Sequence, residues 1–401
     1  MNPFDPTGWS TADLADPYPI YRRYREGDPV HLGAHATWYL FGHDDITEVL
    51  SAPHYGRNPS AAGSTVIPPA HDRLRRMVEN WLVFMDPPRH TKIRALLAKR
   101  FSPKMVAGLR PRIEQIAARL AEPLRDRPLV DLVDEFAAPF PILVISELLG
   151  VPDDRLGWFR EQAVTLQEAS SARSGRRPDA YAKAERAANE LTAYFLAEAD
   201  SRTGTGEDLV TLLVTARVDG EALTREEIAA TCVHLLTTGH ETTTNLVSKS
   251  MLALLAHPRL LGELRARPGL LPDAVDELIR FDGPVQMVTR WAYQDDVVHG
   301  RKIKRGDKVV LVLGSANRDP SRFERPDELR LDRRAARHCG FGIGIHFCLG
   351  SPLAKAEAEI ALRALLAAMP AFDLAGEPVV YVDDLVFHGP ARLPLTTGVH
   401  A

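Results

Sequence analysis

The segment Phe341-Gly342-Ile343-Gly344-Ile345-His346-Phe347-Cys348-Leu349-Gly350 carries most of the information in this chain. It places one cysteine in a glycine-rich loop directly ahead of residues 355–369, which are rich in Ala, Leu and Glu and are therefore predicted to be helical. Ser351 is predicted to cap that helix, with Pro352 in its first turn. Glycine lacks a Cβ atom, so the backbone of this loop can approach a flat ligand closely. Because a thiolate is stabilised at a helix N-terminus, the loop predicts an ionised sulfur presented to a metal.

Composition limits the classes of protein that the chain can belong to. Its 401 residues are 45% hydrophobic and 25% charged, as in soluble globular proteins. The net charge of -4 argues against a nucleic-acid partner. Three cysteines do not make a disulfide scaffold, which favours a reducing, cytoplasmic location. No stretch approaches the roughly 18 apolar residues of a membrane helix, and the first residues do not resemble a signal peptide, so we expect no membrane association.

The distribution of helical and strand-like patterns predicts a single, mainly α domain over residues 1–401, with small β-sheets. Residues 88–278 are mostly helical in pattern, whereas residues 30–32 and 37–41 favour a hairpin. Further strands are predicted at 309–312 and 379–382. Segments 54–80 and 169–180 are predicted to be loops, either solvated connections or a lid over a substrate.

A long helix with an unusual interior is predicted from Thr224 to about His257. Thr224 and Glu227 fit a capping box, and the helix would be about 48 Å long at 1.5 Å per residue. Its centre, residues 237–244, holds five threonines and a glycine, which are poor helix formers. Thr242 can bond a carbonyl one turn back or release that carbonyl to water, and such local openings cluster at functional sites. The alternative is a small-residue packing contact at Gly239.

Two apparent motifs, for a zinc protease and for dinucleotide binding, are rejected, and a structural zinc site explains only part of the sequence. The His240-Glu241 pair begins like a zinc-protease motif, but the second histidine is absent. The glycines of the cysteine loop do not form a dinucleotide-binding motif, because Phe347 stands where the third glycine belongs. A zinc site is conceivable but leaves the glycines and the helix centre unexplained; it would use His338, Cys339, His346 and Cys348. Cys339 and Cys232 are otherwise expected to be small buried side chains.

Three sets of charged residues are weak signals when each is taken alone. Glu277 and Arg280 lie three apart on one helix face, as many surface pairs do. Residues 86–94 open a helix that sets His90 and Arg94 on one face, where they can bind a carboxylate. Arg290 follows ten residues after Arg280.

Taken together and in this order, the motifs resemble the cytochrome P450 haem-thiolate monooxygenases, and the resemblance covers essentially the whole chain. The four motifs are D-P-P-x-H-x-x-x-R at 86–94, T-G-x-E-T-T at 238–243, Glu277-x-x-Arg280, and F-G-x-G-x-H-x-C-x-G at 341–350. The resemblance implies a single-domain cytochrome P450 fold built around a long central helix.

The resemblance also implies roles for individual residues around haem b. Cys348 would be the axial thiolate, which donates electron density to the iron. Glu277 and Arg280 would brace the cysteine loop. The side chains expected to hold the two haem propionates are His90, Arg94, Arg290 and His346.

On the opposite face of the haem, Thr242 and Glu241 match the pair that manages proton delivery for oxygen activation in this family. His240 occupies the unspecified position of the motif and would either join the relay or face a neighbouring helix or the pocket rim. Thr238 departs from the alanine or glycine that is usual in the family. A β-branched hydroxyl there would narrow the space above the haem.

Electrons for O₂ activation would come from NAD(P)H through a ferredoxin reductase and a ferredoxin, since no flavin or iron–sulfur sequence is fused to the chain. Arg333, Arg334 and Arg337 precede the cysteine loop and are predicted to meet an acidic ferredoxin.

The substrate prediction rests on a narrower resemblance, to the bacterial cytochromes P450 of indolocarbazole biosynthesis. It is carried by residues 78–84, 141–146, 163–170 and 231–236. Those enzymes couple the two indole rings of chromopyrrolic acid through an aryl–aryl bond, so a bis-indole substrate is expected here. The predicted pocket-lining residues are Leu235, Thr238, Val285, Gln286, Met287, Val288 and Phe387. Arg173, Arg176 and Arg177 would steer an anion or simply be solvated.

Three alternatives stay open at this point. The first is a hydroxylase of a polyketide, terpenoid or peptide natural product, which shares every catalytic residue. The second is a non-catalytic haem sensor, which would have no need of the Glu241–Thr242 pair. The third is the zinc-binding protein described above.

Overall fold

The computed structural model describes residues 1–169, 179–333, 337–376 and 378–398. The α-helices in this part of the chain are α1 (Thr11–Ala15), α2 (Tyr18–Gly27), α3 (His43–Ser51), α4 (Asp72–Glu79), α5 (Arg89–Ala98), α6 (Pro103–Ala121), α7 (Pro139–Leu149), α8 (Leu156–Gln167), α9 (Ala180–Ser201), α10 (Leu209–Thr215), α11 (Arg225–Ala256), α12 (Pro258–Ala266), α13 (Leu271–Asp282), α14 (Leu313–Ala316) and α15 (Ser351–Ala368). The strands are β1 (Val30–Leu32), β2 (Thr37–Leu40), β3 (Tyr55–Gly56), β4 (Leu129–Asp131), β5 (Arg217–Val218), β6 (Glu221–Ala222), β7 (Met287–Ala292), β8 (Asp296–Val298), β9 (Arg301–Ile303), β10 (Lys308–Val312), β11 (Phe372–Leu374) and β12 (Pro394–Thr397).

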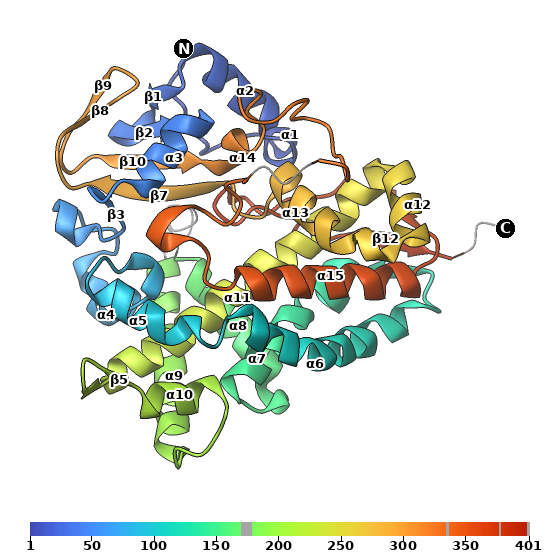
Figure 1. The fold of residues 1–401 in the computed structure, drawn as a ribbon, viewed down its shortest axis with the longest axis horizontal. Helices are drawn as coiled ribbons and strands as arrows, with labels where there is room; N and C mark the ends of the chain where they lie inside the picture. The colour runs from blue at the N-terminus through green and yellow to red at the C-terminus, as the bar shows by residue number, and fades with distance from the viewer. Residues whose placement is uncertain (170–178, 334–336, 377, 399–401) are drawn as a thin grey trace.

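The strands form small sheets at the margins of a helical body, as predicted. The largest sheet has the order β1-β2-β10-β7-β3, and β1 and β2 pair as the expected antiparallel hairpin. A second sheet joins β11, β12 and β4. Figure 1 shows the first sheet beside the N-terminal helices at one end of the molecule, while helices fill the rest. This confirms the mainly α fold with small β-sheets.

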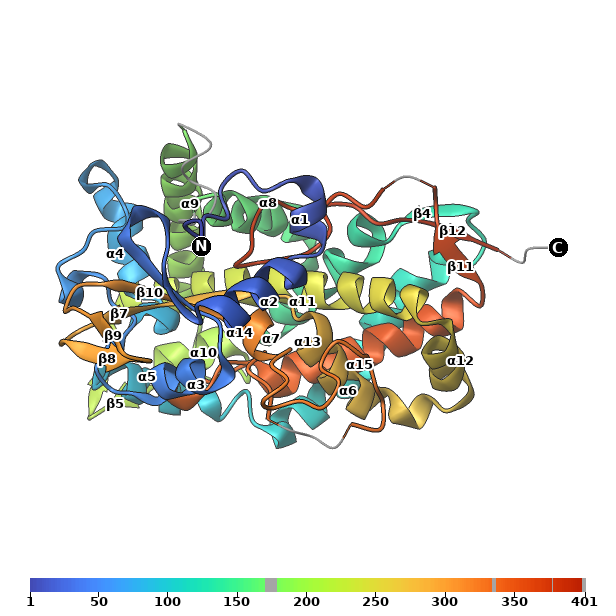
Figure 2. The same cartoon turned by 90° about the horizontal axis from the view of Figure 1, so that it is seen from above.

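The central helix α11 runs through the middle of the molecule, and other helices pack around it (Figures 1 and 2). Its neighbours include α7, α8, α9, α13 and α15. Thr224 and Glu227 form the predicted capping box, with the Thr224 backbone N–H donating to the Glu227 carboxylate at 2.7 Å. The helix is buried around most of its circumference, as expected for a helix with neighbours on several sides.

The centre of α11 is regular α-helix, so the expected opening or π-bulge is absent from it. The Thr242 hydroxyl donates to the Thr238 carbonyl at 2.9 Å, which is the first of the two predicted alternatives. A Cβ atom on Gly239 would lie 3.6 Å from Ile145 of α7. Gly239 therefore makes the small-residue helix contact that the sequence left as an alternative.

Three local predictions were wrong. Segment 54–80 is not only loop, because it contains β3 and the amphipathic helix α4, whose Leu74 and Met77 are buried. Residues 379–382 do not form a strand, since their hydrogen bonds make only the isolated bridge between Tyr381 and Pro390. Ser351 is not the cap of α15 but its first residue, because Gly350 takes the cap position.

Part of the second predicted loop, with Arg173, Arg176 and Arg177, lies outside the described residues. Within the described part of the chain, we find no helix with both the length and the apolar character needed to cross a membrane.

Candidate haem-thiolate site

The cysteine loop folds into a tight hairpin that ends at α15. The Cys348 backbone N–H donates to the Phe341 carbonyl at 2.8 Å, and Gly342 donates to the Cys339 carbonyl at 2.8 Å. Gly342 and Gly344 have φ values of 70° and 77°, in the left-handed region that favours glycine. A Cβ atom on Gly344 would also lie 2.6 Å from the Leu50 carbonyl oxygen. Two of the loop glycines are therefore required by the fold itself.

The sulfur of Cys348 lies where backbone donors converge. Burial raises the pKa of the Cys348 thiol, whereas the backbone N–H groups of Gly350 and Ser351 and the Arg94 guanidinium favour the thiolate. A cationic metal against the sulfur would tip this balance fully toward the thiolate. A Cβ atom on Gly350 would meet no atom within 4 Å, so open space lies beside the loop. The loop thus presents a sulfur ligand suited to iron, with no crowding at the glycine two residues later.

The four predicted propionate ligands belong to one cluster, in which His90 and Arg290 are buried and Arg94 and His346 are half-buried. The rings of His90 and His346 lie 4.3 Å apart, and Arg94 donates to the Phe347 carbonyl at 2.5 Å, which ties α5 to the cysteine loop. Arg290 on β7 is only 4% exposed. Burial and, to a smaller extent, the neighbouring Arg57 together lower the pKa of Arg290 to about 9.

Arg57 is a member of this cluster that the sequence analysis missed. It donates to the carbonyls of Val83 at 2.8 Å and Thr289 at 2.6 Å, and burial lowers its pKa to about 10. Asp86 is the carboxylate of the cluster, and the hydrogen bonds it accepts keep its pKa well below the usual range despite burial.

This cluster fits haem b, on observations of the protein alone. Burial also lowers the pKa of His90 to about 4, and neither of its ring nitrogens has a hydrogen-bond partner among the described residues. Buried charges and polar groups are costly unless they are paired. Arg57, Arg94 and Arg290 carry three positive charges against the single carboxylate of Asp86, and the excess of two matches the two propionates, while the lowered pKa values make His90 and His346 neutral hydrogen-bond donors.

The predicted brace is present and extends further than expected. Arg280 makes two hydrogen bonds to Glu277, at 2.7 and 2.8 Å, and both side chains are buried. Arg333 also donates to Glu277, at 3.0 Å. The predicted role of Arg333 in ferredoxin docking is therefore wrong, because its side chain is turned inward and is 10% exposed. Arg337 is exposed, and Arg334 lies outside the described residues.

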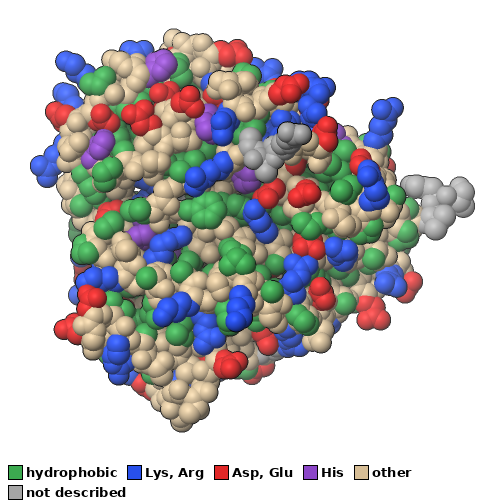
Figure 3. All heavy atoms as spheres, viewed as in Figure 1, with side chains coloured by type: hydrophobic (Ala, Val, Ile, Leu, Met, Phe, Trp, Pro, Cys, Tyr) green, Lys and Arg blue, Asp and Glu red, His purple; other side chains and the backbone are tan. Residues whose placement is uncertain are grey.

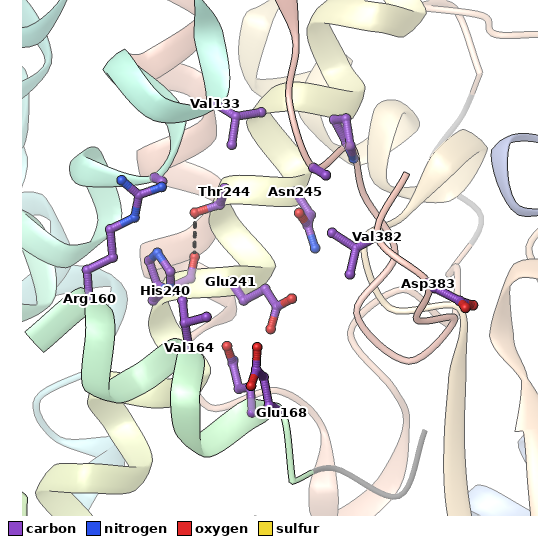
Figure 4. A pocket seen from close by; sticks show the side chains of 14 residues that line it. Val133, Arg160, Val164, Glu168, His240, Glu241, Thr244, Asn245, Val382 and Asp383 are labelled. Carbon is purple, nitrogen blue, oxygen red and sulfur yellow. Dashed lines mark hydrogen bonds between the residues drawn. The ribbon is translucent and has the colours of Figure 1, made fainter. Parts of the chain in front are cut away.

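On the central helix, Thr242 and Glu241 are both half-buried. Glu241 faces a pocket between α11 and α8, seen at close range in Figure 4. His240 is buried against the same pocket, and burial lowers the pKa of its imidazole to about 3. His240 is therefore neutral at physiological pH, and of the two predicted positions it takes the one facing a neighbouring helix.

The predicted substrate-lining residues divide into two groups. Thr238, Val285, Val288 and Phe387 are half-buried, and Leu235 is 8% exposed. Gln286 is instead fully buried and donates to the Tyr18 hydroxyl and the Gly283 carbonyl. Met287 packs in the N-terminal aromatic cluster with Tyr18. These contacts argue against substrate roles for Gln286 and Met287, and the other five residues stay predictions.

Glu357 is a second residue that the sequence analysis missed. It lies on α15, is 4% exposed, and accepts a hydrogen bond from Thr243 of α11 at 3.1 Å. Burial raises the pKa of Glu357 to about 8, so its carboxyl group is mostly protonated at neutral pH. It links the helix that follows the cysteine to the helix that carries Thr242.

We expect Glu357→Gln to reduce the loss of stability at alkaline pH. Because the folded-state pKa lies above the unfolded one, the native state binds more protons, and stability falls as pH rises from about 4.5 to about 8. Urea midpoints at pH 6 and pH 9 measure this. Glu359→Gln on the same helix is the control, since its hydrogen bonds to Arg110 and Arg363 lower that pKa despite burial. Equal pH profiles for wild type and Glu357→Gln would contradict the prediction.

The zinc alternative finds no support in the described chain. No group of three or more His, Cys, Asp or Glu residues is arranged there to hold a metal ion. The Nε2 atom of His338 lies 3.6 Å from the Asp276 carboxylate, so the imidazole is directed to Asp276 and not to a metal shared with Cys348.

Comparison with known proteins gives a consistent result. Residues 175–370 match the family model described as Cytochrome P450. The chain is 38% identical over 392 residues to cytochrome P450 monooxygenase PikC of Streptomyces venezuelae, covering 95% of this chain and 91% of that protein. It is 33% identical over 408 residues to the polyketide biosynthesis cytochrome P450 PksS of Bacillus subtilis, covering 95% and 96%. The crystal structure of CalO2 superposes with a TM-score of 0.91 at 34% identity, covering 99% of both chains.

Proposed function

This chain belongs to the cytochrome P450 family, and from that premise we propose that it oxidises a natural product of bacterial secondary metabolism. The enzyme is a monooxygenase that uses haem b, O₂ and electrons derived from NAD(P)H. The observation that carries this function is the half-buried Cys348, whose sulfur is favoured as a thiolate by the backbone N–H groups of Gly350 and Ser351 and by Arg94. Bound haem supplies the iron that activates oxygen.

The reaction needs protons as well as electrons, and the chain's own residues supply a route. Thr242 holds its hydroxyl against the Thr238 carbonyl, so one turn of α11 fixes where this proton donor lies. Glu241, the residue before Thr242, lines a pocket between α11 and α8. A carboxylate that rotates between the pocket and Thr242 can carry protons inward.

We expect Glu241→Gln and Thr242→Val to uncouple the enzyme, so that less product forms for each NAD(P)H consumed. Each removes one proton-transferring group while keeping side-chain volume, and general acid–base groups contribute about 10²–10⁴-fold to rate. The measurement is product formed per NAD(P)H consumed, with hydrogen peroxide as the other outlet. Thr243→Val is the control, since its hydroxyl donates to Glu357. A ratio unchanged from wild type in both variants would contradict the route.

A ferredoxin and its reductase are proposed as the electron supply. Basic side chains are spread over the face formed by α5, α6 and α15 (Figure 3). Lys99 and Lys104 are exposed there, and Ile345 of the cysteine loop is 52% exposed. An apolar side chain near basic residues suits an acidic electron-transfer protein, which would approach close to Cys348.

We expect the double charge reversal Lys99→Glu/Lys104→Glu to slow reduction by an acidic ferredoxin about 10-fold or more at low salt, and less at high salt. Stopped-flow reduction under carbon monoxide measures the rate. Lys302→Glu on β9, an exposed lysine of the β8–β9 hairpin, which lies away from α6 and α15 in Figure 1, is the matched control. Equal slowing by the control, or no salt dependence, would contradict this docking face.

For the substrate, we propose oxidative aryl–aryl coupling of a bis-indole such as chromopyrrolic acid. The support is an aromatic stack within two segments that carry the indolocarbazole resemblance. The Trp81 and His234 rings lie 5.3 Å apart at 26°, and Trp81 also stacks with Phe84 at 6.3 Å. Flat aromatic side chains in this arrangement suit a flat aromatic substrate.

The second candidate is hydroxylation of a polyketide, favoured by the similarity to the polyketide biosynthesis cytochrome P450 PksS. Spectral titration of the haem-loaded protein decides between the two. Chromopyrrolic acid is expected to shift the iron from low spin to high spin and to yield a coupled product, whereas a macrolactone would do neither. The opposite result would overturn the bis-indole assignment and favour the polyketide. A haem sensor predicts no turnover with any substrate.

A further inference from the structure

A buried lysine stands at the far end of the α11 stripe that carries the predicted proton-transferring residues. The members of this stripe occupy positions i, i+3, i+4, i+7 and i+11 of the helix, which share one side of it: Thr238, Glu241, Thr242, Asn245 and Lys249. Lys249 lies about 10.5 Å beyond Thr242 along the helix axis, at 1.5 Å per residue. Its side chain is only 1% exposed. Because lysine is almost never fully buried unless it is paired, this position needs an explanation.

The ammonium group of Lys249 has one acceptor for each of its three N–H donors. Its Nζ atom lies 2.8 Å from the Asp282 carboxylate, 3.1 Å from the Gly283 carbonyl oxygen and 2.6 Å from Nδ1 of His388. Asp282 ends α13, and it supplies the opposite charge that a buried cation requires. His388 belongs to a segment near the C-terminus. Lys249 therefore joins α11 to two segments that are distant from it in the sequence.

His388 is fully buried and uses both of its ring nitrogens. Its Nε2 atom lies 2.5 Å from the carbonyl oxygen of Leu14 on α1. A carbonyl can only accept, so Nε2 carries the ring proton and Nδ1 is the acceptor for Lys249. Burial and the nearby ammonium group lower the pKa of His388 to about 3, in agreement with a neutral imidazole. The histidine is thus held from two sides, by α11 and by α1.

Residues 381–391, which we call the C-terminal turn, lie along the same stripe of α11. A Cβ atom on Gly389 would lie 2.2 Å from Oδ1 and 2.7 Å from Cβ of Asn245, so the turn touches this side chain with its backbone. Within the turn, the Val382 N–H donates to the Gly389 carbonyl at 2.9 Å. The Tyr381 ring stacks on His388 with centroids 4.7 Å apart. The turn therefore meets α11 at two positions, four residues apart on one side of the helix.

The C-terminal turn forms one wall of the pocket that Glu241 lines. The lining combines Glu241 and Asn245 of α11 with three apolar residues of the turn, Val382, Pro390 and Ala391. Figure 4 shows Val382 facing Asn245 across this space. The wall therefore lies beside the residues that are predicted to transfer protons. A displacement of the turn would change the width of the space, because α11 is held independently by its other helical neighbours.

Building on the function proposed above, we propose that Lys249 and His388 are positioning residues for the substrate. By holding the C-terminal turn against α11, they set the width of the substrate site beside Glu241. Both act through the turn rather than by touching the substrate. Phe387, a predicted substrate-lining residue, directly precedes His388, so the same anchor fixes where it lies.

Azole ligands of increasing length test this on the full haem-loaded protein, because they report the space beside the iron whatever the natural substrate is. Imidazole fills little beyond the iron, whereas 4-phenylimidazole and a biphenylimidazole extend into the substrate site. We expect Lys249→Met and His388→Gln to weaken binding of the two longer azoles about three- to tenfold, because a mobile wall must be ordered on binding. The Kd of imidazole, measured by the same spectral titration, should change less than about twofold, with unchanged haem content.

A second substitution of His388 separates the contact with α11 from general damage. In His388→Asn the amide oxygen can take the place of Nδ1 and accept from Lys249. In His388→Gln the amide instead reaches the place of Nε2 and keeps the bond to the Leu14 carbonyl. We therefore expect His388→Asn to retain the affinity for long azoles that His388→Gln loses. Gly389→Ala, which forces the turn away from Asn245, should behave like His388→Gln.

Two matched variants away from the C-terminal turn are the controls, and both should bind every azole like wild type. His257→Gln changes a histidine at the end of α11 whose Nδ1 atom bonds the Ala253 carbonyl at 2.7 Å. Gly262→Ala adds a Cβ atom on α12 at a place where no atom of the described chain lies within 4 Å.

Normal imidazole binding together with unchanged affinity for the long azoles in His388→Gln and Gly389→Ala would overturn the positioning role alone. Equal losses in His388→Asn and His388→Gln would overturn the part assigned to Lys249. A wild-type protein that gives no azole spectrum would instead refute haem binding, and the proposed function with it. If Lys249→Met does not fold, His388→Gln and Gly389→Ala decide.

Discussion

Replacing Cys348 with serine is expected to remove the thiolate-specific Soret band of the reduced carbon monoxide complex and to lower turnover more than about 100-fold. Loss of a residue that merely supports a metal ligand costs about 10–100-fold, and Cys348 is the proposed ligand itself. A serine hydroxyl at this position stays protonated, so it donates far less electron density to iron. The absorbance spectrum and the product rate are measured on the same sample.

The other two cysteines are the controls for this experiment. Cys232 and Cys339 are both fully buried, and burial raises the pKa of their thiols above the usual range. Cys232→Ala and Cys339→Ala should therefore keep the thiolate-type spectrum, with at most a modest loss of stability. A Cys348→Ser protein with the wild-type spectrum would refute the assignment of the axial ligand. If Cys339→Ala lost the thiolate-type spectrum, the axial ligand would be Cys339 and its assignment to Cys348 would be wrong.

The parts of the site that the sequence predicted are those encoded within a few residues. The capping box of α11 needs only Thr224 and Glu227, three positions apart. The pair Glu277–Arg280 is likewise local. In each case one helical turn brings the two groups together, so spacing alone indicates the contact.

The parts that the sequence did not predict depend on contacts between distant segments. Arg57 lies in a stretch without periodicity, and the carbonyls that hold it belong to residues 26 and 232 positions away. Glu357 looks like any helical glutamate until α15 packs against Thr243. Backbone carbonyls carry no signature in the side-chain sequence, and burial of a carboxyl group is decided only by tertiary packing.

At residues 379–382 the sequence predicted a strand that the fold does not form, again because contacts between distant segments decide the structure. Its β-favouring residues are typical of a strand, but the segment turns back on itself, with Val382 donating to the Gly389 carbonyl at 2.9 Å. His388 then fixes the turn to Lys249 on α11. A tertiary anchor therefore outweighs local strand preference, which is itself strongly context-dependent.

Replacing Arg280 with methionine is expected to lower the free energy of unfolding by about 3–5 kcal/mol, because it breaks a buried ion pair, of which Arg333 replaces only part, and removes a donor from buried backbone carbonyls. Arg280 also donates to the carbonyls of Asn317 at 2.9 Å, Pro326 at 2.8 Å and Glu328 at 3.0 Å. The Asn317 side chain in turn accepts from the Cys339 backbone N–H at 2.7 Å. Loosening this brace should therefore weaken haem retention along with stability.

The double variant Glu277→Leu/Arg280→Met distinguishes a simple ion pair from the hub of a network. An isolated buried pair is often replaced by apolar residues at little cost. Here the double change would remove the Arg280 donor from the Asn317 and Pro326 carbonyls, the acceptor of the Arg330 N–H, and the carboxylate partner of Arg333, so we expect little recovery over the single variant. Urea midpoints and haem absorbance measure both effects.

The control is Arg112→Met, which breaks the exposed pair with Glu147 and should lower the free energy of unfolding by less than about 1 kcal/mol. Full recovery in the double variant would show that the brace acts through the Glu277–Arg280 pair alone, whereas a persistent loss of haem would show that the carbonyls of residues 317–328 depend on Arg280 to hold the cysteine loop in place.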